Sequence, residues 1–377
     1  MTGRNIPVKL VCVAGARPNF MKLAPLFRLL RTHPQFIAKL VHTGQHYDEQ
    51  MSGAFFRDLD LPEPDYYLGV GSGTHGQQTA EIIRRLEPIL MEEAPEGVLV
   101  VGDVNSTLAA ALTAAKLNIP VVHIEAGLRS FDRSMPEEIN RVVTDAVSSL
   151  LLASEPSGVE NLRREGVPAE RIRLIGNLMI DSLLAHLPAA RALNMPARFG
   201  FSPGQYAVLT LHRPANVDQP ARLKEIFEAL GEVAKRCPLI FPVHPRTRVR
   251  LAELGICFPD GLICTEPLRY PEFVGLMAEA AVVFTDSGGV QEETTVLGIP
   301  CLTLRNNTER PITIEQGTNR LAGTSKDSIL TVWQLHLDNP KRGRVPELWD
   351  GKAADRAMAA LEEFFFHNEV QRVCSHQ

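Results

Sequence analysis

The sequence lacks a hydrophobic run long enough to cross a bilayer, because no apolar stretch approaches the roughly 20 residues that a membrane helix needs. It also lacks an excess of positive charge: 39 Lys and Arg residues face 44 Asp and Glu residues, which gives a net charge of −5. Proteins that bind nucleic acid or anionic membranes nonspecifically carry basic surfaces. We therefore predict neither a nucleic-acid partner nor a membrane partner.

Cysteines are few, and none has the spacing of a zinc site or a redox motif. The six residues are scattered and lie mostly in apolar runs: Cys12, Cys237, Cys257, Cys264, Cys301 and Cys374. Residues 10–16 loosely imitate a signal peptide, but an amphipathic helix pattern follows directly, so we interpret them as a buried strand. We predict reduced thiols, no disulfide, no metal and a cytoplasmic protein.

The sequence contains short apolar strands that alternate with helical patterns from end to end, which predicts parallel βαβ units of the α/β class. A length of 377 residues exceeds what one hydrophobic core supports, so two domains are expected. Residues 187–204 hold several prolines and little periodicity, and we place the linker near them. Two Rossmann-like domains facing a cleft are the predicted architecture, with a helix at 353–366 that packs against one of the two domains.

Polar residues gather after the strands of the first half, where open α/β sheets bind ligands. The strand at 121–124 is followed by Glu125 and Arg129, and Pro136 then opens a helix with Glu137, Glu138 and Arg141. After earlier strands come these candidates: Arg17, Lys22, Gln45, His46 and Asp103. Taken singly, each group fits a helix cap, an acidic helix start or a solvated loop equally well. That simpler interpretation weakens when four successive strands end in such groups.

The second half repeats this pattern. His212 with Arg213 and His244 with Arg246 follow two strands, and a charged loop containing Arg310 follows the last clear strand. The turn Ser287-Gly288-Gly289 opens a helix that contains Glu292 and Glu293. A diphosphate would find backbone N–H donors and the positive helix end together there, and the glutamates could bind sugar hydroxyls. The sequence therefore predicts a nucleotide-sugar site, although it has neither G-x-G-x-x-G nor a phosphate-binding P-loop motif.

These motifs resemble the non-hydrolysing UDP-N-acetylglucosamine (UDP-GlcNAc) 2-epimerases, which have the two-domain GT-B fold. The segments that carry the resemblance run in order along the chain: 15–18 (GARP) with Lys22, 43–46 (TGQH), 102–103 (GD), 123–129 (HIEAGLR), 136–141 (PEEINR), 212–214 (HRP), 287–293 (SGGVQEE) and 308–311 (TERP). Asn19 stands where the family commonly has an acidic residue. The resemblance implies that the last helix crosses back onto the N-terminal domain. It gives residues 1–180 with 364–377 as the sugar-binding domain and 181–363 as the UDP-binding domain.

The family interconverts UDP-GlcNAc and UDP-ManNAc without NAD, so the resemblance implies no cofactor, a UDP-sugar substrate and a homodimer. It implies that uridine and diphosphate are held by Arg17, His212, Phe273, Ser287, Gly288, Gly289, Glu293 and Arg310. The catalytic set that we take from it is Asp103, Glu125, Glu137, Arg141 and His212. Lys22, Gln45, His46 and His244 complete the expected substrate contacts.

The expected chemistry follows from the position of the proton at C2, which is not next to a carbonyl. Breaking the C1–O bond to UDP while this proton leaves would give UDP and 2-acetamidoglucal, and UDP would then add back. We hypothesise that Asp103, Glu125 and Glu137 share the acid and base roles, with Glu137 oriented by Arg141. The pattern does not decide which is acid and which is base.

Three other functions share parts of this pattern. A GT-B glycosyltransferase would use the same diphosphate site but needs an acceptor, and a hydrolysing epimerase would release free ManNAc. A non-catalytic nucleotide-sugar sensor would have no use for the carboxylates. Incubation of UDP-GlcNAc in D₂O separates these functions by their products.

Overall fold

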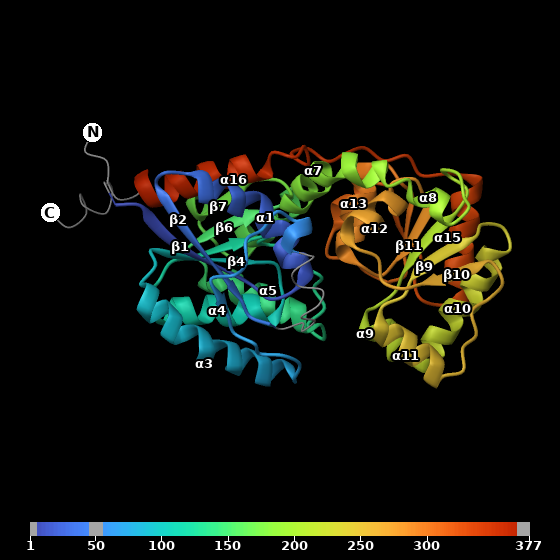
Figure 1. The fold of residues 1–377 in the computed structure, drawn as a ribbon, viewed down its shortest axis with the longest axis horizontal. Helices are drawn as coiled ribbons and strands as arrows, with labels where there is room; N and C mark the ends of the chain where they lie inside the picture. Colours follow the sequence, from blue (N-terminus) through green and yellow to red (C-terminus); the bar gives the residue numbers. More distant parts are fainter. Residues whose placement is uncertain (1–5, 45–55, 368–377) are drawn as a thin grey trace. The chain divides into compact units, whose positions relative to one another are not determined.

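The computed structural model describes residues 6–44 and 56–367 of the chain. The chain divides into two compact units (Figure 1). The first consists of Met1–Ser182 and Glu347–Gln377, and the second of Leu183–Pro346.

The first unit is built on a parallel sheet of seven strands in the order β3-β2-β1-β4-β5-β6-β7. Its strands are β1 (Val8–Ala14), β2 (Phe36–His42), β3 (Tyr66–Tyr67), β4 (Gly97–Val101), β5 (Val121–Ile124), β6 (Leu150–Ala153) and β7 (Ile172–Leu174). The strand order reverses between β1 and β4. Ligands of doubly wound sheets bind at the carboxyl ends of the strands at such a reversal.

Helices cover both faces of this sheet, as Figure 1 shows, with α1 and α16 on one face and α3, α4 and α5 on the other. The helices of this unit are α1 (Arg17–Thr32), α3 (His75–Glu93), α4 (Asn105–Lys116), α5 (Pro136–Val147), α6 (Pro156–Arg164), α16 (Ala353–Glu362), and the short η1 (Ala169–Arg171) and η2 (Glu363–His367). Alternate strand residues such as Val98 and Val100 pack with Ala110 of α4 and Leu86 of α3 in one core. Burial on both faces explains why β4 and β6 are continuous apolar runs.

The second unit contains a parallel sheet of six strands in the order β10-β9-β8-β11-β12-β13. Its strands are β8 (Ala207–Thr210), β9 (Leu239–Pro242), β10 (Leu262–Thr265), β11 (Val282–Thr285), β12 (Cys301–Thr303) and β13 (Asn319–Leu321). Its helices are α8 (Met195–Arg198), α9 (Pro214–Val217), α10 (Pro220–Ala234), α11 (Pro245–Glu253), α12 (Tyr270–Met277), α13 (Gly288–Leu297), α14 (Pro311–Glu315) and α15 (Lys326–Asp338). Here the order reverses between β8 and β11, in the arrangement of a Rossmann fold.

Two hydrophobic cores lie on opposite faces of this second sheet. Leu209 and Phe241 belong to one core with Leu230 of α10, while Val208 and Ile240 belong to the other with Met277 of α12. Neighbouring residues of one strand point to opposite faces, so β8, β9 and β11 each contribute to both cores.

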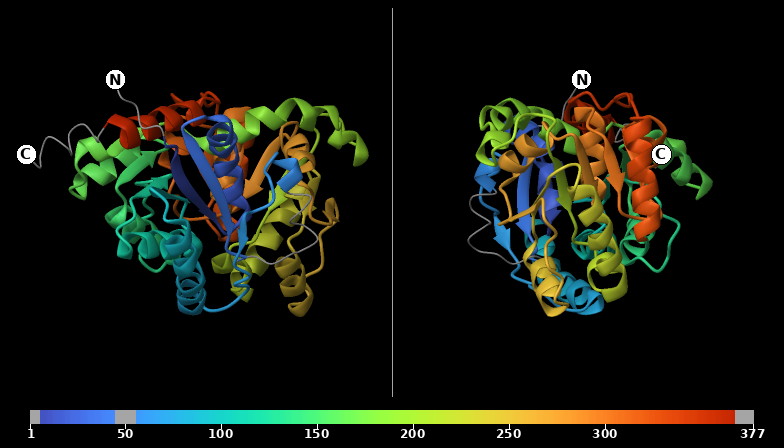
Figure 2. Two further views of the ribbon diagram at one scale, coloured as in Figure 1. Left: turned by 60° about the vertical axis from the view of Figure 1, so that its left-hand side comes forward. Right: turned by 90° about the vertical axis from the view of Figure 1, so that its right-hand side faces the viewer.

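The last helix returns to the first unit, where α16 lies beside α1 (Figure 2). The Trp349 indole donates to the Ser154 carbonyl at 3.1 Å, and the Asp181 carboxylate accepts the N–H groups of Ala353 and Ala354 at 3.1 and 2.7 Å. Asp181 thereby satisfies the free donors at the start of α16. These contacts explain why the second unit ends at Pro346, earlier than the predicted residue 363.

The stretch near which the linker was predicted, residues 187–204, is partly helical. Helix α7 (Leu178–Ala192) runs through Pro188, and α8 follows it. Proline removes one helical hydrogen bond, but the apolar run at its start keeps the helix packed: Leu178, Met179, Ile180 and Leu183 are buried. The sequence analysis also did not predict β13 and α15. Strand β13 has only three residues, which is too short to give a recognisable pattern.

No helix among residues 6–44 and 56–367 is long and apolar enough to span a membrane.

Candidate functional site

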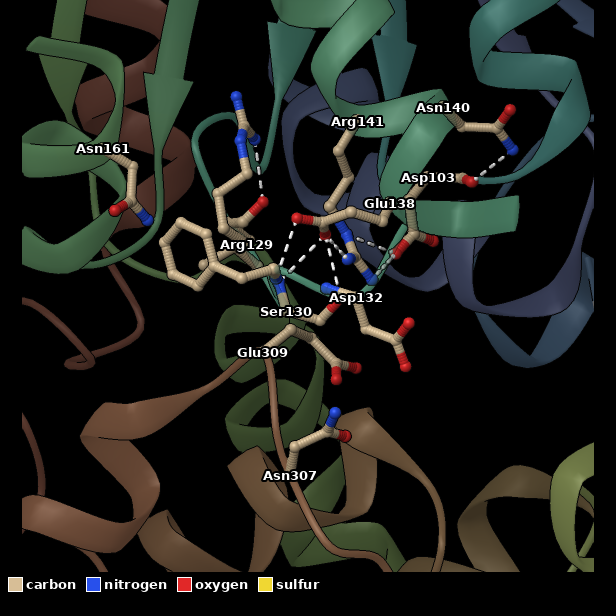
Figure 3. A network of polar contacts seen from close by, with 12 residues as sticks. Asp103, Arg129, Ser130, Asp132, Glu138, Asn140, Arg141, Asn161, Asn307 and Glu309 are labelled. Atoms are coloured by element: carbon tan, nitrogen blue, oxygen red, sulfur yellow. Dashed lines mark hydrogen bonds and ion pairs between the residues drawn. The ribbon is translucent and has the colours of Figure 1, made fainter. Parts of the chain in front are cut away.

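Helix α5 brings a charged network to the end of β4 in the first unit. Arg141 donates from Nε and Nη2 to one carboxylate oxygen of Asp103, at 3.0 and 2.7 Å. Its Nη1 donates to Glu138 at 2.6 Å (Figure 3). Asn140, on the same helix, donates to the Asp103 carbonyl at 2.8 Å. Asp103 is therefore fixed by its main chain and by its carboxylate, while 23% of its side chain stays exposed to solvent.

Glu138 accepts hydrogen bonds both from Arg141 and from the loop before α5. Its two carboxylate oxygens accept the N–H groups of Ser130 and Phe131, both at 2.9 Å, and the Ser130 hydroxyl at 3.0 Å (Figure 3). Burial raises the pKa of this carboxyl, but the two N–H donors and the Arg141 charge outweigh burial, so the pKa is lowered. Glu138 is thus an ionised structural group, with only 3% of its surface exposed.

Glu125 lies at the end of β5 and forms a buried ion pair with Lys22 of α1. Its backbone φ is +70°, a left-handed conformation that is uncommon for residues other than glycine. Such strain is concentrated at functional sites. A small cavity lies beside the pair, lined also by Ser154 and Asn177. Lys22 and Glu125 therefore place two opposite charges at the carboxyl edge of the first sheet, where α1 approaches the end of β5.

Asn19 connects the first turn of α1 with the end of β4. Its side-chain oxygen accepts the Ala16 N–H at 3.0 Å, and its amide donates to the Val101 carbonyl at 2.9 Å. An acidic side chain could accept the first bond but could not donate the second. The asparagine thus fixes the turn that carries Arg17, which is half-buried as the first residue of α1.

Asp286 organises the corresponding point of the second unit, between β8 and β11. It is fully buried and accepts the N–H groups of His212 and Arg213, the latter at 2.9 Å. The Asn216 amide donates to it at 3.2 Å, and the His212 ring lies 3.0 Å from it through Nδ1. The His212 side chain is 47% exposed. The ring is therefore oriented by a buried charge while its other nitrogen remains available to a ligand.

Three arginines surround one buried carboxylate near the start of α13. Glu309 is contacted by Arg213 at 3.1 Å, Arg305 at 2.7 Å and Arg310 at 2.8 Å. Arg310 also lies 2.8 Å from Glu292 through Nε. Burial opposes ionisation of Glu309, but the three guanidinium groups hold its pKa well below the usual value. The cluster therefore brings three guanidinium groups together around the buried carboxylates Glu309 and Glu292.

The start of α13 adds backbone donors to this arginine cluster. Ser287 is the N-cap residue, and its side chain makes no capping hydrogen bond. A Cβ atom on Gly288 would lie 2.8 Å from Glu309 and 2.9 Å from Arg310, so only glycine lets these groups approach the helix start. Free N–H groups at a helix N-terminus beside arginine side chains suit a phosphate or diphosphate.

The two adjacent glutamates of α13 have different environments. Glu293 accepts the Tyr270 hydroxyl at 2.8 Å and is almost fully buried. Glu292 has no exposed surface and pairs with Arg310. The prediction that both glutamates bind sugar hydroxyls was therefore wrong for Glu292, because this side chain cannot reach a ligand.

The buried carboxylates predict acid-sensitive stability. Charge partners outweigh burial at Asp286 and Glu309 and lower their pKa below the ordinary values of 3.8 and 4.5. A carboxyl whose pKa is depressed on folding stabilises the chain above its unfolded pKa and loses this contribution as the pH falls toward the folded value. We expect the thermal midpoint to drop between pH 5 and pH 3. The thermal midpoint of the Asp286→Asn variant should fall less over this range. A wild-type midpoint that is equal at pH 5 and pH 3 would contradict the view that these ionised carboxylates stabilise the fold.

Residues 28–362 match the family model described as UDP-N-acetylglucosamine 2-epimerase. The chain belongs to this family. Family members are isomerases, and the match spans most of both units.

A UDP-N-acetylglucosamine 2-epimerase of Methanocaldococcus jannaschii is 43% identical over 365 residues, which are 94% of this chain and 99% of that protein. The crystal structure of this M. jannaschii enzyme with UDP-GlcNAc and UDP superimposes with a TM-score of 0.88, at the same identity and coverage. A UDP-2,3-diacetamido-2,3-dideoxy-D-glucuronate 2-epimerase of Pseudomonas aeruginosa is 41% identical over 327 residues, covering 86% of this chain and 90% of that protein. The similarity to the M. jannaschii structure shows the predicted GT-B fold of two Rossmann-like domains.

Most predicted residues of this epimerase-family chain fall into one of the two polar regions. In the first unit, Arg17, Lys22, Asp103, Glu125, Glu137 and Arg141 lie in the elements just described. In the second unit, His212, Ser287, Gly288, Gly289, Glu293 and Arg310 do so. His244 is exposed just before α11, and Phe273 of α12 packs partly buried against a core cluster. Gln45 and His46 lie outside the described residues.

Arg141 does not orient Glu137 as expected. Its ion pairs are with Glu138 and Asp103. The Glu137 side chain is half-buried and makes no hydrogen bond or ion pair with a described residue. Glu137 and Glu138 lie four and three residues before Arg141, and both spacings allow a helical ion pair, so the sequence could not distinguish them. Asp286 and Glu309 were also missed as organising groups, because their partners come from separate strand ends.

Among the residues that the structure describes, no cluster of three or more His, Cys, Asp or Glu side chains is placed to hold a metal ion.

Proposed function

We propose that this enzyme reversibly epimerises UDP-GlcNAc at C2 to UDP-ManNAc by elimination and re-addition of UDP. Membership of the family and 43% identity to a protein named for this epimerase activity support the proposal. The observation that carries it is the pair of polar regions: acid–base groups at the strand ends of the first unit, and an anion site at α13 in the second.

In the first step, the C2 proton passes to a carboxylate and the C–H electrons form the C1=C2 double bond. The C1–O bond breaks at the same time, and its electrons leave on the β-phosphate of UDP. The products are UDP and 2-acetamidoglucal. Positioned acid–base groups typically contribute ~10²–10⁴-fold to the rate. Asp103, Glu125 and Glu137 are the proposed groups, and Glu125 forms a direct ion pair with Lys22.

In the second step, a phosphate oxygen of UDP adds back to C1 while C2 receives a proton on the opposite face. Inversion needs a donor that stands on the other side of the ring from the base, so two of the three carboxyl groups must act in turn. Asp103, Glu125 and Glu137 are the candidates for these two roles.

The second unit would stabilise the leaving diphosphate. The free N–H groups at the start of α13 and the Arg310 guanidinium form a preorganised set of donors, which needs no rearrangement as negative charge develops on the departing oxygen. The Glu293 carboxylate, held by Tyr270, is proposed to bind the ribose. The same donors keep UDP bound until it returns.

His212→Ala is expected to raise the dissociation constant of UDP about tenfold, because it removes one hydrogen bond to a charged group. Asp286 keeps its backbone donors in this variant, so the fold should persist. Isothermal titration with UDP measures the change. His33→Ala, in the first unit, is the matched control. An unchanged dissociation constant for His212→Ala would remove this residue from the nucleotide site.

A second UDP-sugar is a candidate substrate. The P. aeruginosa relative, 41% identical, is named for a UDP-2,3-diacetamido-2,3-dideoxy-D-glucuronate. Both sugars carry an acetamido group at C2 and a UDP at C1, so the same elimination serves either. Comparison of kcat/KM for the two UDP-sugars decides between them, and UDP-GlcNAc is expected to give the higher value.

A proton NMR time course with UDP-GlcNAc in D₂O tests the reaction. The proposal predicts that UDP-ManNAc accumulates and that deuterium enters C2 of both UDP-sugars. Free ManNAc would indicate a hydrolysing epimerase. No change without an added acceptor would indicate a glycosyltransferase or a sensor, and either result would overturn the proposal.

We also propose that the enzyme acts in the cytoplasm as a homodimer. The five cysteines that the structure describes are free, and burial raises the pKa of Cys301 to about 11, which keeps this thiol protonated and unreactive. Unpaired thiols suit a reducing compartment. Light scattering on the purified chain tests the dimer, which should have twice the 41.6 kDa mass of one chain.

A further inference from the structure

His123 is a buried histidine behind the acid–base groups. It lies on β5 with no exposed surface, two residues before Glu125. Its Nε2 lies 2.8 Å from the carbonyl oxygen of Gly102, the residue before Asp103, and its Nδ1 lies 2.6 Å from a carboxylate oxygen of Asp145. The ring thus connects the turn that carries Asp103 with helix α5.

The partners determine which ring atoms donate. A carbonyl oxygen only accepts, so Nε2 carries a proton toward Gly102. Burial raises the pKa of Asp145, but the His123 and Arg129 charges outweigh burial and the pKa is lowered, so Asp145 is an ionised acceptor. Nδ1 therefore donates to it. Both contacts are directional hydrogen bonds, and the second is reinforced by charge.

Asp145 extends the connection to the turn after β5. Its second carboxylate oxygen accepts the Gly127 N–H at 3.0 Å and lies 2.7 Å from Arg129. Gly127 has a φ of +82°, and a Cβ there would lie 2.2 Å from the Gly158 carbonyl, so this turn is tightly fitted. Gly127 follows Glu125 by two residues. One buried carboxylate on α5 therefore restrains both strand-end turns.

The arrangement joins three separate elements by side-chain bonds. Asp103 follows β4, Glu125 follows β5, and Glu137 and Arg141 lie on α5, the helix that also carries Asp145. None of the bonds made by His123 or Asp145 faces solvent, because His123 is fully buried and Asp145 is 1% exposed. These bonds therefore form without substrate. They set the geometry of the acid–base groups and do not contact the reacting atoms.

We propose that His123 and Asp145 are positioning residues for the epimerisation, and that His123 acts chiefly through the Gly102 carbonyl on Asp103. The proposal rests on the proposed function. A displacement of about 1 Å at a reacting group can cost on the order of 10²-fold in rate. Loss of the bond to Gly102 is expected to lower kcat by about that factor and to leave UDP affinity unchanged.

Two substitutions separate the bonds of the imidazole. The amide nitrogen of asparagine approximates the position of Nδ1, so His123→Asn keeps a donor toward Asp145 and loses the bond to Gly102. The amide nitrogen of glutamine approximates Nε2, so His123→Gln keeps a donor toward Gly102. A positioning role predicts a kcat loss of about 10²-fold for His123→Asn and less than about tenfold for His123→Gln. A merely structural role predicts activities that follow the folded fraction of each variant.

The experiment measures kcat, KM, UDP dissociation constant and UDP-binding stoichiometry for wild type and both variants, with turnover followed by NMR in D₂O. His336→Asn, a substitution of a buried histidine on α15, is the control and should keep wild-type kcat. Asp145→Asn, which keeps the size of the side chain, is the second variant if the histidine variants do not fold, and should also lose about 10²-fold in kcat. A wild-type enzyme without exchange at C2 would overturn the proposed function, and this role with it.

A double substitution tests whether His123 acts through Asp103. Two substitutions that act through the same group do not have multiplicative effects on kcat. In a chain that already carries Asp103→Asn, His123→Asn should therefore lower kcat by less than about threefold. If wild type epimerises and His123→Asn remains within about threefold of it, the positioning role is overturned alone. Equal losses in the Asn and Gln variants, or a full 10²-fold further loss in the double variant, would overturn the route through Gly102.

Discussion

Asp103→Asn is expected to lower the epimerisation rate by roughly 10²–10⁴-fold while the dissociation constant of UDP stays the same. The substitution keeps the shape of the side chain but removes a group that can take or return a proton. Folding should survive, because Arg141 keeps its ion pair with Glu138 and the Asp103 main chain keeps its bond from Asn140. Turnover by NMR and UDP titration on the same sample measure both quantities.

Asp60→Asn is the control for this variant, because Asp60 is exposed in the same unit. It should retain wild-type turnover. An Asp103→Asn enzyme within a few-fold of wild type, at the same UDP-binding stoichiometry, would show that Asp103 carries no proton in the reaction.

Arg310→Lys is expected to raise the dissociation constant of UDP by about 10–100-fold, which corresponds to the ~1.5–3 kcal/mol of a charge-assisted hydrogen bond. Lysine keeps the positive charge that the buried Glu292 and Glu309 require, so the cluster should remain folded. It loses the planar fork that can bind a phosphate through two donors. We also expect kcat to fall, because the same donors are proposed to stabilise the leaving diphosphate.

The matching control is Arg236→Lys, an exposed arginine of the second unit that contacts Gln334 at 3.4 Å. UDP affinity should be unchanged there. If Arg310→Lys bound UDP as tightly as wild type, the diphosphate would have to be held by other groups, and the assignment of the α13 region would be wrong.

The sequence predicted the alternating strands and helices because each buried strand is an apolar run bounded by a turn. It missed β13, which has only three residues and is recognisable only by its pairing with β12. It also missed α15, although Ile329 and Trp333 are buried one helical turn apart and could have indicated an amphipathic helix. The end of the second unit was misplaced because α16 is held by Asp181 and Trp349 through contacts distant in sequence.

Candidate site residues could be predicted where they follow strands, since parallel strands place their carboxyl ends at one edge of a sheet. The ion pairs between these residues could not be predicted from the sequence. Arg141 had two glutamates within helical reach and selected Glu138. Asp286 and Glu309 acquire their roles only when β8, β11 and the loop before α14 meet, and no local pattern encodes that meeting. The same holds for His123, whose two partners lie 21 and 22 residues away.

Cleavage of the bond between C1 and the diphosphate is the central claim, and positional isotope exchange measures it most directly. UDP-GlcNAc carrying ¹⁸O in the bridge between C1 and the β-phosphorus is incubated with the enzyme, and ³¹P NMR follows the label. If UDP departs and returns, the label spreads to the non-bridging oxygens of the β-phosphate as UDP-ManNAc forms. Formation of UDP-ManNAc with all ¹⁸O still in the bridge would contradict elimination and re-addition.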